Sequence, residues 1–335
     1  MFDLIYHFPE QLEESLVLTN RALKEGKDFL DKINDIEKIV VVGMGGSGIA
    51  GDIVFSLTYS FLKSPLLVIK DYYLPFFCNR KSFYFVISYS GETEETIFNY
   101  QQLKRRKLPL IVITADGKLK VLAEKNNDLL FILPHNYPPR QALAYLTIPI
   151  LLTLSKLAII PNCQQEIEKT ILYLKRIRKK LNEKAKRITK LIENKIPYII
   201  VDSYCYLPIA YRWKNQFNEN TKILAFYSYL PEQNHNEINA LPFLNNLQKD
   251  LFVFILKNPL SYKRNLLRIN FLLKLLKEQK ISHLLITPFS KNSFLNVFSL
   301  IMLGDFISYH WALKRNIDPL KIELIEDLKN FLTKF

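Results

Sequence analysis

Short apolar runs rich in β-branched residues recur along the chain, and segments with helical periodicity lie between them. In the N-terminal half the apolar runs stand at 38–43, 66–70, 83–90, 110–114 and 129–133, with helical patterns at 47–62 and 94–107. Strands that are apolar on both faces are typical of parallel sheets covered by crossover helices. The pattern restarts with apolar runs at 196–202, 224–229, 251–256 and 282–287. We therefore predict an α/β protein with two parallel sheets.

Two long helical segments, near 140–160 and 164–194, separate these halves. A chain of 335 residues also fits about two domains. We expect an N-terminal domain over 1–155, connecting helices over 156–195 and a C-terminal domain over 196–335. Further helices are predicted near 208–220, 262–279, 292–315 and 320–332.

Two apolar stretches raise the question of a membrane. Pro149 and Lys156 interrupt the stretch at 142–161, and Asp305 and His310 lie within the stretch at 293–313. A charge at the centre of a bilayer costs about 2.5–3.5 kcal/mol, so both stretches fit buried helices better than membrane spans. No basic and then apolar leader opens the sequence, and a cytoplasmic location is the default expectation.

The net charge of +14 does not by itself indicate a nucleic-acid partner. The densest basic stretch, at 175–190, is punctuated at helical spacing by Leu174, Ile177, Leu181, Ile188 and Leu191. This spacing predicts an amphipathic helix with one solvated basic face. No motif of a nucleic-acid-binding module accompanies the stretch, so no nucleic acid is expected.

The cysteines and histidines indicate no metal site. Cys78, Cys163 and Cys205 are widely spaced, so they form neither a disulfide framework nor a zinc-binding pair. Four of the five histidines form no set with the spacing of metal ligands, and no chemistry is assigned to them: His7, His135, His283 and His310.

The glycines point to a ligand. Five of the nine glycines in the chain fall within nine residues: Gly43, Gly45, Gly46, Gly48 and Gly51. They stand where the first apolar run ends and a helix begins. Such a turn presents free N–H groups and the positive end of the helix dipole to an anion, and glycine allows a ligand to approach the backbone closely. A tight turn with close helix packing is the alternative explanation.

A second loop refines the choice of ligand. The spacing Gly43-x-Gly45-x-x-Gly48 satisfies a dinucleotide-binding fingerprint, and Asp71 lies near the position of a ribose-binding acid. However, the run at 83–90 leads into Ser88, Ser90 and Thr93 around Gly91. Such a group of hydroxyls suits the three oxygens of a phosphomonoester, although an ordinary helix cap would also use them. A sugar phosphate uses both loops, whereas a dinucleotide does not require the second.

At these residues the chain resembles a known family. The segments GMGGSGIAGDI (43–53) and SYSGETEET (88–96) are similar to the sugar isomerase (SIS) fold, and more closely to the bifunctional phosphoglucose/phosphomannose isomerases. The resemblance covers nearly the whole chain and includes PRQALAYL (139–146), KNQFNEN (214–220), NHNE (234–237), GDF (304–306) and IDP (317–319). It implies two SIS-type subdomains, each a parallel sheet in an αβα sandwich.

The resemblance also implies a reaction and its residues. An aldose 6-phosphate opens, and a proton moves between C1 and C2 through a cis-enediolate, with no metal and no redox cofactor. Glu219 would be the general base, and Arg140 would stabilise the enediolate. Phosphate would bind Ser88, Ser90 and Thr93, while Gly45, Gly46 and Ser47 would line the sugar side.

Two further residues are implied by the resemblance. His235 would shuttle the proton of the ring oxygen, from a loop that reaches the active site of the partner subunit, so a homodimer is expected. Lys329 in the last helix is the candidate for a lysine near the ring oxygen, with Lys321 as the competing candidate. The segment that follows Pro319 differs from the Thr-Pro often found there.

Some alternatives remain open at this stage. Glu92 stands where SIS loops often carry asparagine, so its carboxylate either weakens phosphate binding or points away from the phosphate. Glu237 is the next candidate for the base. A non-catalytic SIS protein that only binds a sugar phosphate and an NAD(P)-dependent dehydrogenase are the rival functions. The presence of both Glu219 and His235 favours the isomerase.

Overall fold

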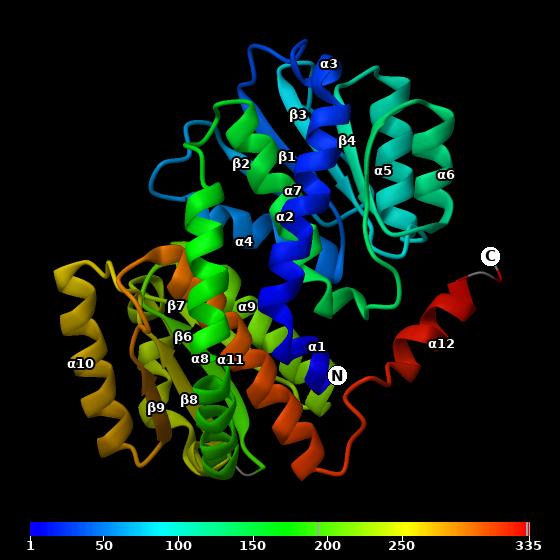
Figure 1. The fold of residues 1–335 in the computed structure, drawn as a ribbon. Helices are drawn as coiled ribbons and strands as arrows, with labels where there is room; N and C mark the ends of the chain where they lie inside the picture. The colour runs from blue at the N-terminus through cyan, green and yellow to red at the C-terminus, as the bar shows by residue number, and fades with distance from the viewer. Residues whose placement is uncertain (193, 333, 335) are drawn as a thin grey trace. The chain divides into compact units, whose positions relative to one another are not determined.

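The structure is a computed structural model that describes residues 1–192, 194–332 and 334 (Figure 1). It confirms the α/β class, with two sheets of parallel strands flanked by helices. The chain divides into two compact units, His7–Lys175 and Met1–Tyr6 with Arg176–Phe335. The division falls inside α8 (Gln164–Ile192), within the segment 156–195 that we expected to connect the domains. Residues 1–6 group with the C-terminal unit, although the sequence-based division places them in the N-terminal one.

The first sheet contains five parallel strands in the order β2-β1-β3-β4-β5. Their bounds are β1 Lys38–Val42, β2 Leu66–Ile69, β3 Ser82–Ile87, β4 Leu110–Thr114 and β5 Leu129–Ile132. All five lie where the apolar runs predicted strands. Because β2 and β3 lie on opposite sides of β1, the loops that follow β1 and β3 leave the sheet in different directions. Ligands of open α/β sheets bind in the crevice that such a switch point creates.

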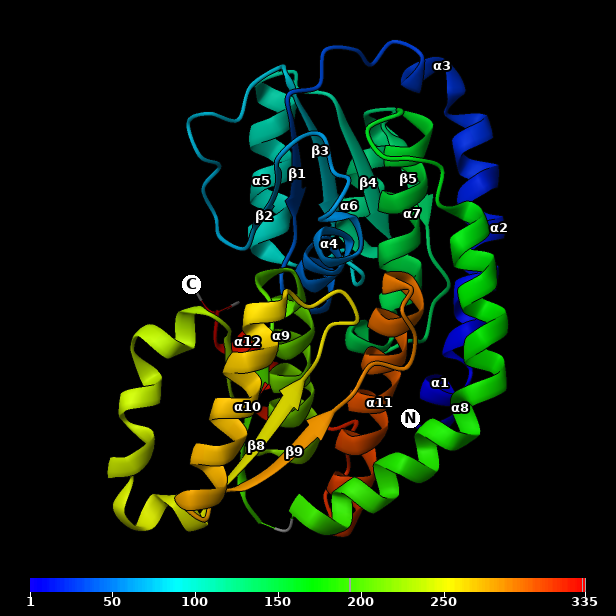
Figure 2. The ribbon, with the colours of Figure 1, turned by 90° about the vertical axis from the view of Figure 1, so that its left-hand side faces the viewer.

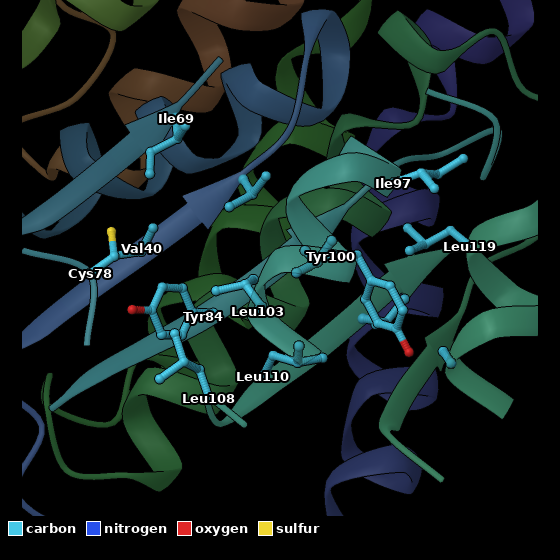
Figure 3. Close-up of a cluster of buried hydrophobic side chains, with 14 residues drawn as sticks. Val40, Ile69, Cys78, Tyr84, Ile97, Tyr100, Leu103, Leu108, Leu110 and Leu119 are labelled. Atoms are coloured by element: carbon cyan, nitrogen blue, oxygen red, sulfur yellow. The ribbon is translucent and has the colours of Figure 1, made fainter. Parts of the chain in front are cut away.

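Both faces of this sheet are covered, which explains why the central strands β1, β3 and β4 are apolar at nearly every position. Val40 and Val42 of β1 point to the face under α5 (Glu94–Arg105) and α6 (Gly117–Lys125), where they join a cluster that contains Tyr84 and Tyr100 (Figure 3). Val41 faces the opposite side, against Gly51 of α4 (Gly45–Thr58). Successive side chains of a strand alternate between the faces, and here both faces are core.

Two of the longer helices of this unit have no counterpart in the sequence-based assignment. These are α2 (Phe8–Glu25), which follows the short α1 (Phe2–Tyr6), and α6, which starts at Gly117. A short helix, α3 (Lys27–Leu30), follows α2. α2 packs against α7 (Leu143–Lys156), and Tyr145 Oη donates a hydrogen bond of 2.6 Å to Glu14 Oε2. The apolar stretch around Pro149 is therefore a buried helix.

The second sheet contains four parallel strands in the order β7-β6-β8-β9. Their bounds are β6 Ile196–Val201, β7 Phe226–Tyr229, β8 Leu251–Leu256 and β9 Ser282–Ile286. The helices are α9 Leu207–Gln216, α10 Lys263–Glu278, α11 Ser293–Lys314 and α12 Glu323–Leu332. α10 lies along β8 and β9 (Figure 2). Short helical turns fill 232–249, where no regular structure was predicted.

The second apolar stretch is also a buried helix. α11 packs against α9, which lies on β6 and β7, and most residues of α11, including Asp305, are buried. Within the described ranges, no helix combines the length and the apolar character needed to cross a membrane.

Candidate active site

The glycine-rich turn between β1 and α4 is shaped by close backbone contacts. Gly45 has a φ of +48°, which disfavours side chains, and it is exposed at the start of α4. A Cβ on Gly46 would lie 2.8 Å from the carbonyl oxygen of Pro139, and one on Gly48 would collide with the carbonyl of Gly43. The turn therefore needs glycine for its own conformation and for packing, and it leaves Gly45 open to a ligand.

The two loops predicted to share a ligand are joined by a hydrogen bond. The backbone N–H of Tyr89 donates to Ser47 Oγ at 3.1 Å, across the switch point between β1 and β3. Ser88 Oγ donates to Thr93 Oγ1 at 2.9 Å and accepts from Gly91 N at 3.1 Å. These bonds hold the two loops together at the carboxyl edge of the sheet, where Ser47 and Ser88 are buried and Thr93 is half-buried.

Ser90 and Glu92 point to different partners in this loop. Ser90 is exposed, and its Oγ accepts the N–H of Glu92 at 3.3 Å. Glu92 Oε1 accepts the N–H of Lys118 at 2.7 Å, in the first turn of α6. A carboxylate is favourable at a helix N-terminus because of the helix dipole. This geometry supports the alternative in which the carboxylate of Glu92 points away from the phosphate, because it binds the start of α6.

Arg140 lies at the same crevice. It belongs to the 3₁₀ turn η1 (Pro139–Gln141), whose backbone packs directly against Gly46. The side chain is 5% exposed. The N-terminal unit therefore brings together all six predicted substrate-binding residues and the predicted arginine.

Glu219 lies in the other unit, on a π-helical turn, η3 (Phe217–Thr221), that continues α9. π-turns are rare and occur frequently at functional sites. Lys222, with a left-handed φ of +56°, ends the turn. The neighbouring side chains of this turn are held: Asn218 Oδ1 accepts Ala225 N at 3.1 Å, and Asn220 Nδ2 donates to Ser308 Oγ at 2.9 Å.

A buried ion pair fixes the helix that leads to this turn. Arg212 Nη2 and Asp305 Oδ2 are 2.7 Å apart, with side chains only 4% and 6% exposed. Gln216 Nε2 donates to Asp305 Oδ1 at 2.6 Å. Gly304 allows the indole of Trp213 to pack, because a Cβ there would overlap with the ring. In the sequence the segment GDF at 304–306 is only a motif shared with the family, whereas in the structure it supports the helix that leads to the Glu219 turn.

His235 is exposed in the turn η4 (Glu232–His235). Glu237 follows in η5 (Glu237–Asn239) and is tied to the sheet: its carboxylate accepts hydrogen bonds from Ser228 Oγ at 2.9 Å and from Tyr198 Oη. Desolvation raises the pKa of Glu237. Its two hydroxyl partners indicate a structural anchor for the loop that carries His235.

The two candidate lysines differ in their surroundings. Lys222 Nζ donates to the carbonyl oxygens of both Glu219 and Lys321, so the backbone at Lys321 lies beside the Glu219 turn. The ammonium group of Lys321 is 3.4 Å from Glu323 Oε1. Lys329 lies in the last turn of α12 and is exposed. The C-terminal unit thus carries Glu219, His235 and both lysines, and it joins the backbone at Lys321 to the Glu219 turn.

Known proteins match this chain along its whole length. A SIS domain matches residues 32–160, and a bacterial phospho-glucose isomerase C-terminal SIS domain matches residues 181–332. The bifunctional phosphoglucose/phosphomannose isomerase of Caldicellulosiruptor bescii is 34% identical over 100% of this chain and 99% of its own. The protein so named from Thermoplasma volcanium is 34% identical over 95% of this chain and 98% of its own. The chain belongs to the bifunctional phosphoglucose/phosphomannose isomerase family.

Other similarities cover less of the chain or have a lower sequence identity. A D-glucosamine-6-phosphate 4-epimerase of Sulfolobus acidocaldarius is 32% identical, but over only 62% of this chain and 64% of its own. The solved structure of tagatose-6-phosphate ketose/aldose isomerase from Escherichia coli has a TM-score of 0.72 at 15% identity, and covers 95% of this chain and 93% of its own. This structural likeness concerns the fold alone.

This member of the isomerase family has a second switch point, between β6 and β8. The side chains at the second switch point differ from those at the first. The fully buried Asp202 follows β6 and accepts the N–H of Asn258 at 2.9 Å. Asn258 Nδ2 in turn donates to Ser203 Oγ at 3.1 Å. A buried carboxyl group replaces the open glycine turn, so this crevice does not offer the anion site of the first. Sequence reasoning did not single out Asp202.

Asp202 is expected to make the stability of the protein depend on pH. Burial raises the pKa of Asp202 to about 6, above its usual value of 3.8. Between these values the folded protein binds the proton more tightly than the unfolded chain, so stability falls as pH rises from about 4 to 6. The shift corresponds to on the order of 3 kcal/mol. The free energy of unfolding, measured by denaturant titration at pH 4 and pH 7, should differ less between the two pH values in Asp202→Asn than in the wild type. The same pH dependence in both proteins would show that Asp202 is not its source.

Proposed function

We propose that this protein interconverts glucose 6-phosphate and mannose 6-phosphate with fructose 6-phosphate by proton transfer through a cis-enediolate. Membership of the family supports this reaction, and two relatives that match nearly all of the chain are named after it. The observation that carries the proposal is the crevice at the first switch point. There, the Ser47–Tyr89 hydrogen bond joins the glycine turn to the hydroxyl loop, and the backbone of the arginine turn packs on Gly46.

The crevice residues have complementary roles in this reaction. The phosphate group binds the hydroxyls of Ser88, Ser90 and Thr93. The turn at Gly45, Gly46 and Ser47, in which Gly45 is exposed, lies along the sugar. Hydrogen bonds from hydroxyls to an ionised phosphate are stronger than those between neutral groups. Arg140 places a fixed positive charge near the carbon atoms that react, where negative charge develops in the enediolate.

Glu219, His235 and Lys329 supply the proton chemistry in this proposal. Glu219 removes the proton from C2 of the open aldose and returns it to C1, and the proton of the O2 hydroxyl moves to O1 as the ketose forms. His235 transfers the proton of the ring oxygen when the ring opens. Lys329 stabilises that oxygen, and Lys321 remains the second candidate for this role. The exposure of His235 suits a histidine that completes the site of a partner subunit, so we propose a homodimer, which we expect in the cytoplasm.

A coupled assay with each aldose phosphate tests the proposed function. Both glucose 6-phosphate and mannose 6-phosphate should yield fructose 6-phosphate at similar rates with and without EDTA, since the proposed steps use only side chains. Glucosamine 6-phosphate serves as a control substrate, because the Sulfolobus relative is named a D-glucosamine-6-phosphate 4-epimerase. Sugar-phosphate binding without turnover would instead support a non-catalytic SIS protein.

Ser90→Ala should weaken the binding of substrate. Loss of one hydroxyl from a charged hydrogen-bond set costs on the order of 1.5–3 kcal/mol. KM for either aldose phosphate should therefore rise more than tenfold in initial-rate measurements. Ser64→Ala is the matched control, because its hydroxyl bonds to Ile36 O and lies outside the crevice residues. An unchanged KM in Ser90→Ala would place the phosphate elsewhere.

A further inference from the structure

A pocket of about 420 Å³ opens on the C-terminal unit beside the turn that carries His235. η4 and η5 form one wall and α10 forms the other, and the chain around 232–249 runs beside α10 in Figure 2. Its volume lies within the range of small-molecule sites. Six residues line it: Asn234, Ile238, Arg264, Leu267, Arg268 and Phe271.

The pocket has a concentrated positive charge. Arg264 and Arg268 are four residues apart on α10, so their side chains are neighbours and repel each other. None of the lining residues is acidic. Within the described part of the chain, the Nε–H of Arg268 is buried and has no hydrogen-bond partner.

The acids nearest in sequence to the pocket wall are already engaged. Glu237 accepts hydrogen bonds from Ser228 and Tyr198, and Glu232 Oε1 accepts Asn236 Nδ2 at 3.1 Å. These hydrogen bonds direct both carboxylates to partners other than the arginines of the pocket. The positive charge of the pocket therefore remains available to a ligand.

The rest of the lining is apolar and exposed. Leu267 and Phe271 are 59% and 60% exposed, and Ile238 faces them across the pocket. An arginine fork binds the oxygens of a phosphate or carboxylate in pairs, and an aromatic ring beside it contacts the carbon body of the same ligand. The combination suits a small organic anion better than an inorganic ion alone.

We propose that this pocket binds a small organic oxyanion, a phosphate or carboxylate on a compact apolar body, as an effector separate from the substrate. Asn234 lines the pocket and directly precedes His235 in η4. A ligand that contacts Asn234 therefore alters the position of the imidazole and the rate of ring opening. This catalytic consequence rests on the proposed function, whereas binding to the pocket does not.

Calorimetric titration of the full-length protein with phenyl phosphate and with benzoate tests this site. The two probes share one apolar body and differ in the oxyanion, so they distinguish a phosphate effector from a carboxylate one. Phenyl phosphate should show two binding events per protomer in the wild type, one at the pocket and one at the phosphate loop. R264Q/R268Q should lose the pocket event or weaken it at least tenfold. The matched control K274Q/K277Q removes the same charge from α10 outside the pocket residues and should keep both events.

A second variant and a rate measurement separate the possible outcomes. Phe271→Ala should weaken the binding of phenyl phosphate to the pocket several-fold more than the binding of inorganic phosphate. With saturating glucose 6-phosphate, the probe that binds should change kcat in the wild type and not in R264Q/R268Q. Wild-type binding of both probes by R264Q/R268Q would overturn the proposal. A change of oligomeric state in that variant would also overturn it and would identify the face as an interface between copies. If the wild-type protein binds the probe at the pocket but has no isomerase activity, the proposed function is refuted and the binding site is still supported.

Discussion

Glu219→Gln is expected to abolish isomerisation while sugar-phosphate binding stays nearly unchanged. The substitution keeps the size of the side chain and removes the proton acceptor, so only the transition state loses stabilisation. Loss of a general base typically lowers the rate by ~10²–10⁴-fold, and the effect appears in kcat rather than in binding. The measurement is the rate of solvent deuterium incorporation at C1 of fructose 6-phosphate, together with a binding titration.

Two variants control this experiment. His235→Ala should slow turnover of the closed-ring substrates but still permit exchange with substrate that has already opened. Glu237→Gln should keep most of the exchange activity, because the carboxylate of Glu237 is engaged by Ser228 and Tyr198. Exchange at nearly the wild-type rate in Glu219→Gln would exclude Glu219 as the base and make Glu237 the next candidate.

Asp305→Ala is expected to destabilise the protein by about 3–5 kcal/mol. The substitution removes the carboxylate that binds Arg212 and Gln216, and removing one partner of a buried ion pair leaves the other charge in a poorly solvated site. The free energy of unfolding from denaturant titration measures the effect. At a temperature where the variant is folded, kcat should also fall, because α9 no longer holds the Glu219 turn in place.

An exposed ion pair gives the matched control. Lys274 and Glu278 on α10 are 3.8 Å apart, with side chains 73% and 55% exposed, and such pairs contribute about 0–1 kcal/mol. Glu278→Ala should therefore change stability by less than about 1 kcal/mol and leave kcat unchanged. A similarly small loss in Asp305→Ala would show that the buried pair is not what holds α9 against α11.

Much of the fold can be predicted from local sequence patterns. All nine strands of the described chain lie at the apolar runs, because each run is a continuous apolar signal within a few residues. The signal is present even in β7 and β9, which are only partly buried. β7 starts two residues later than predicted, at Phe226. The short helical turns after β7 and the helices α2 and α6 were not predicted, although α2 buries apolar residues at helical spacing.

Part of the candidate site can also be predicted from the sequence, and part of it depends on contacts between distant residues. The glycine turn and the hydroxyl loop are visible in the sequence because their residue types are unusual and clustered. The orientation of Glu92 is not visible, because it depends on the N-terminus of α6, 26 residues further along the chain. The role of Asp305 is equally hidden, because its partner Arg212 is 93 residues away.

Local periodicity and composition are enough to predict the class of fold, the positions of the strands and the residue types of the glycine turn and the hydroxyl loop. The pairing of β3 with β1 on the side opposite β2, which brings Ser47 to Tyr89, is visible only in the folded protein. The same is true of the burial of Asp202 at the second switch point and of the pocket that Arg264 and Arg268 line beside η4. Strand order and hydrogen-bond partners depend on contacts between residues far apart in the chain, and no local pattern records them.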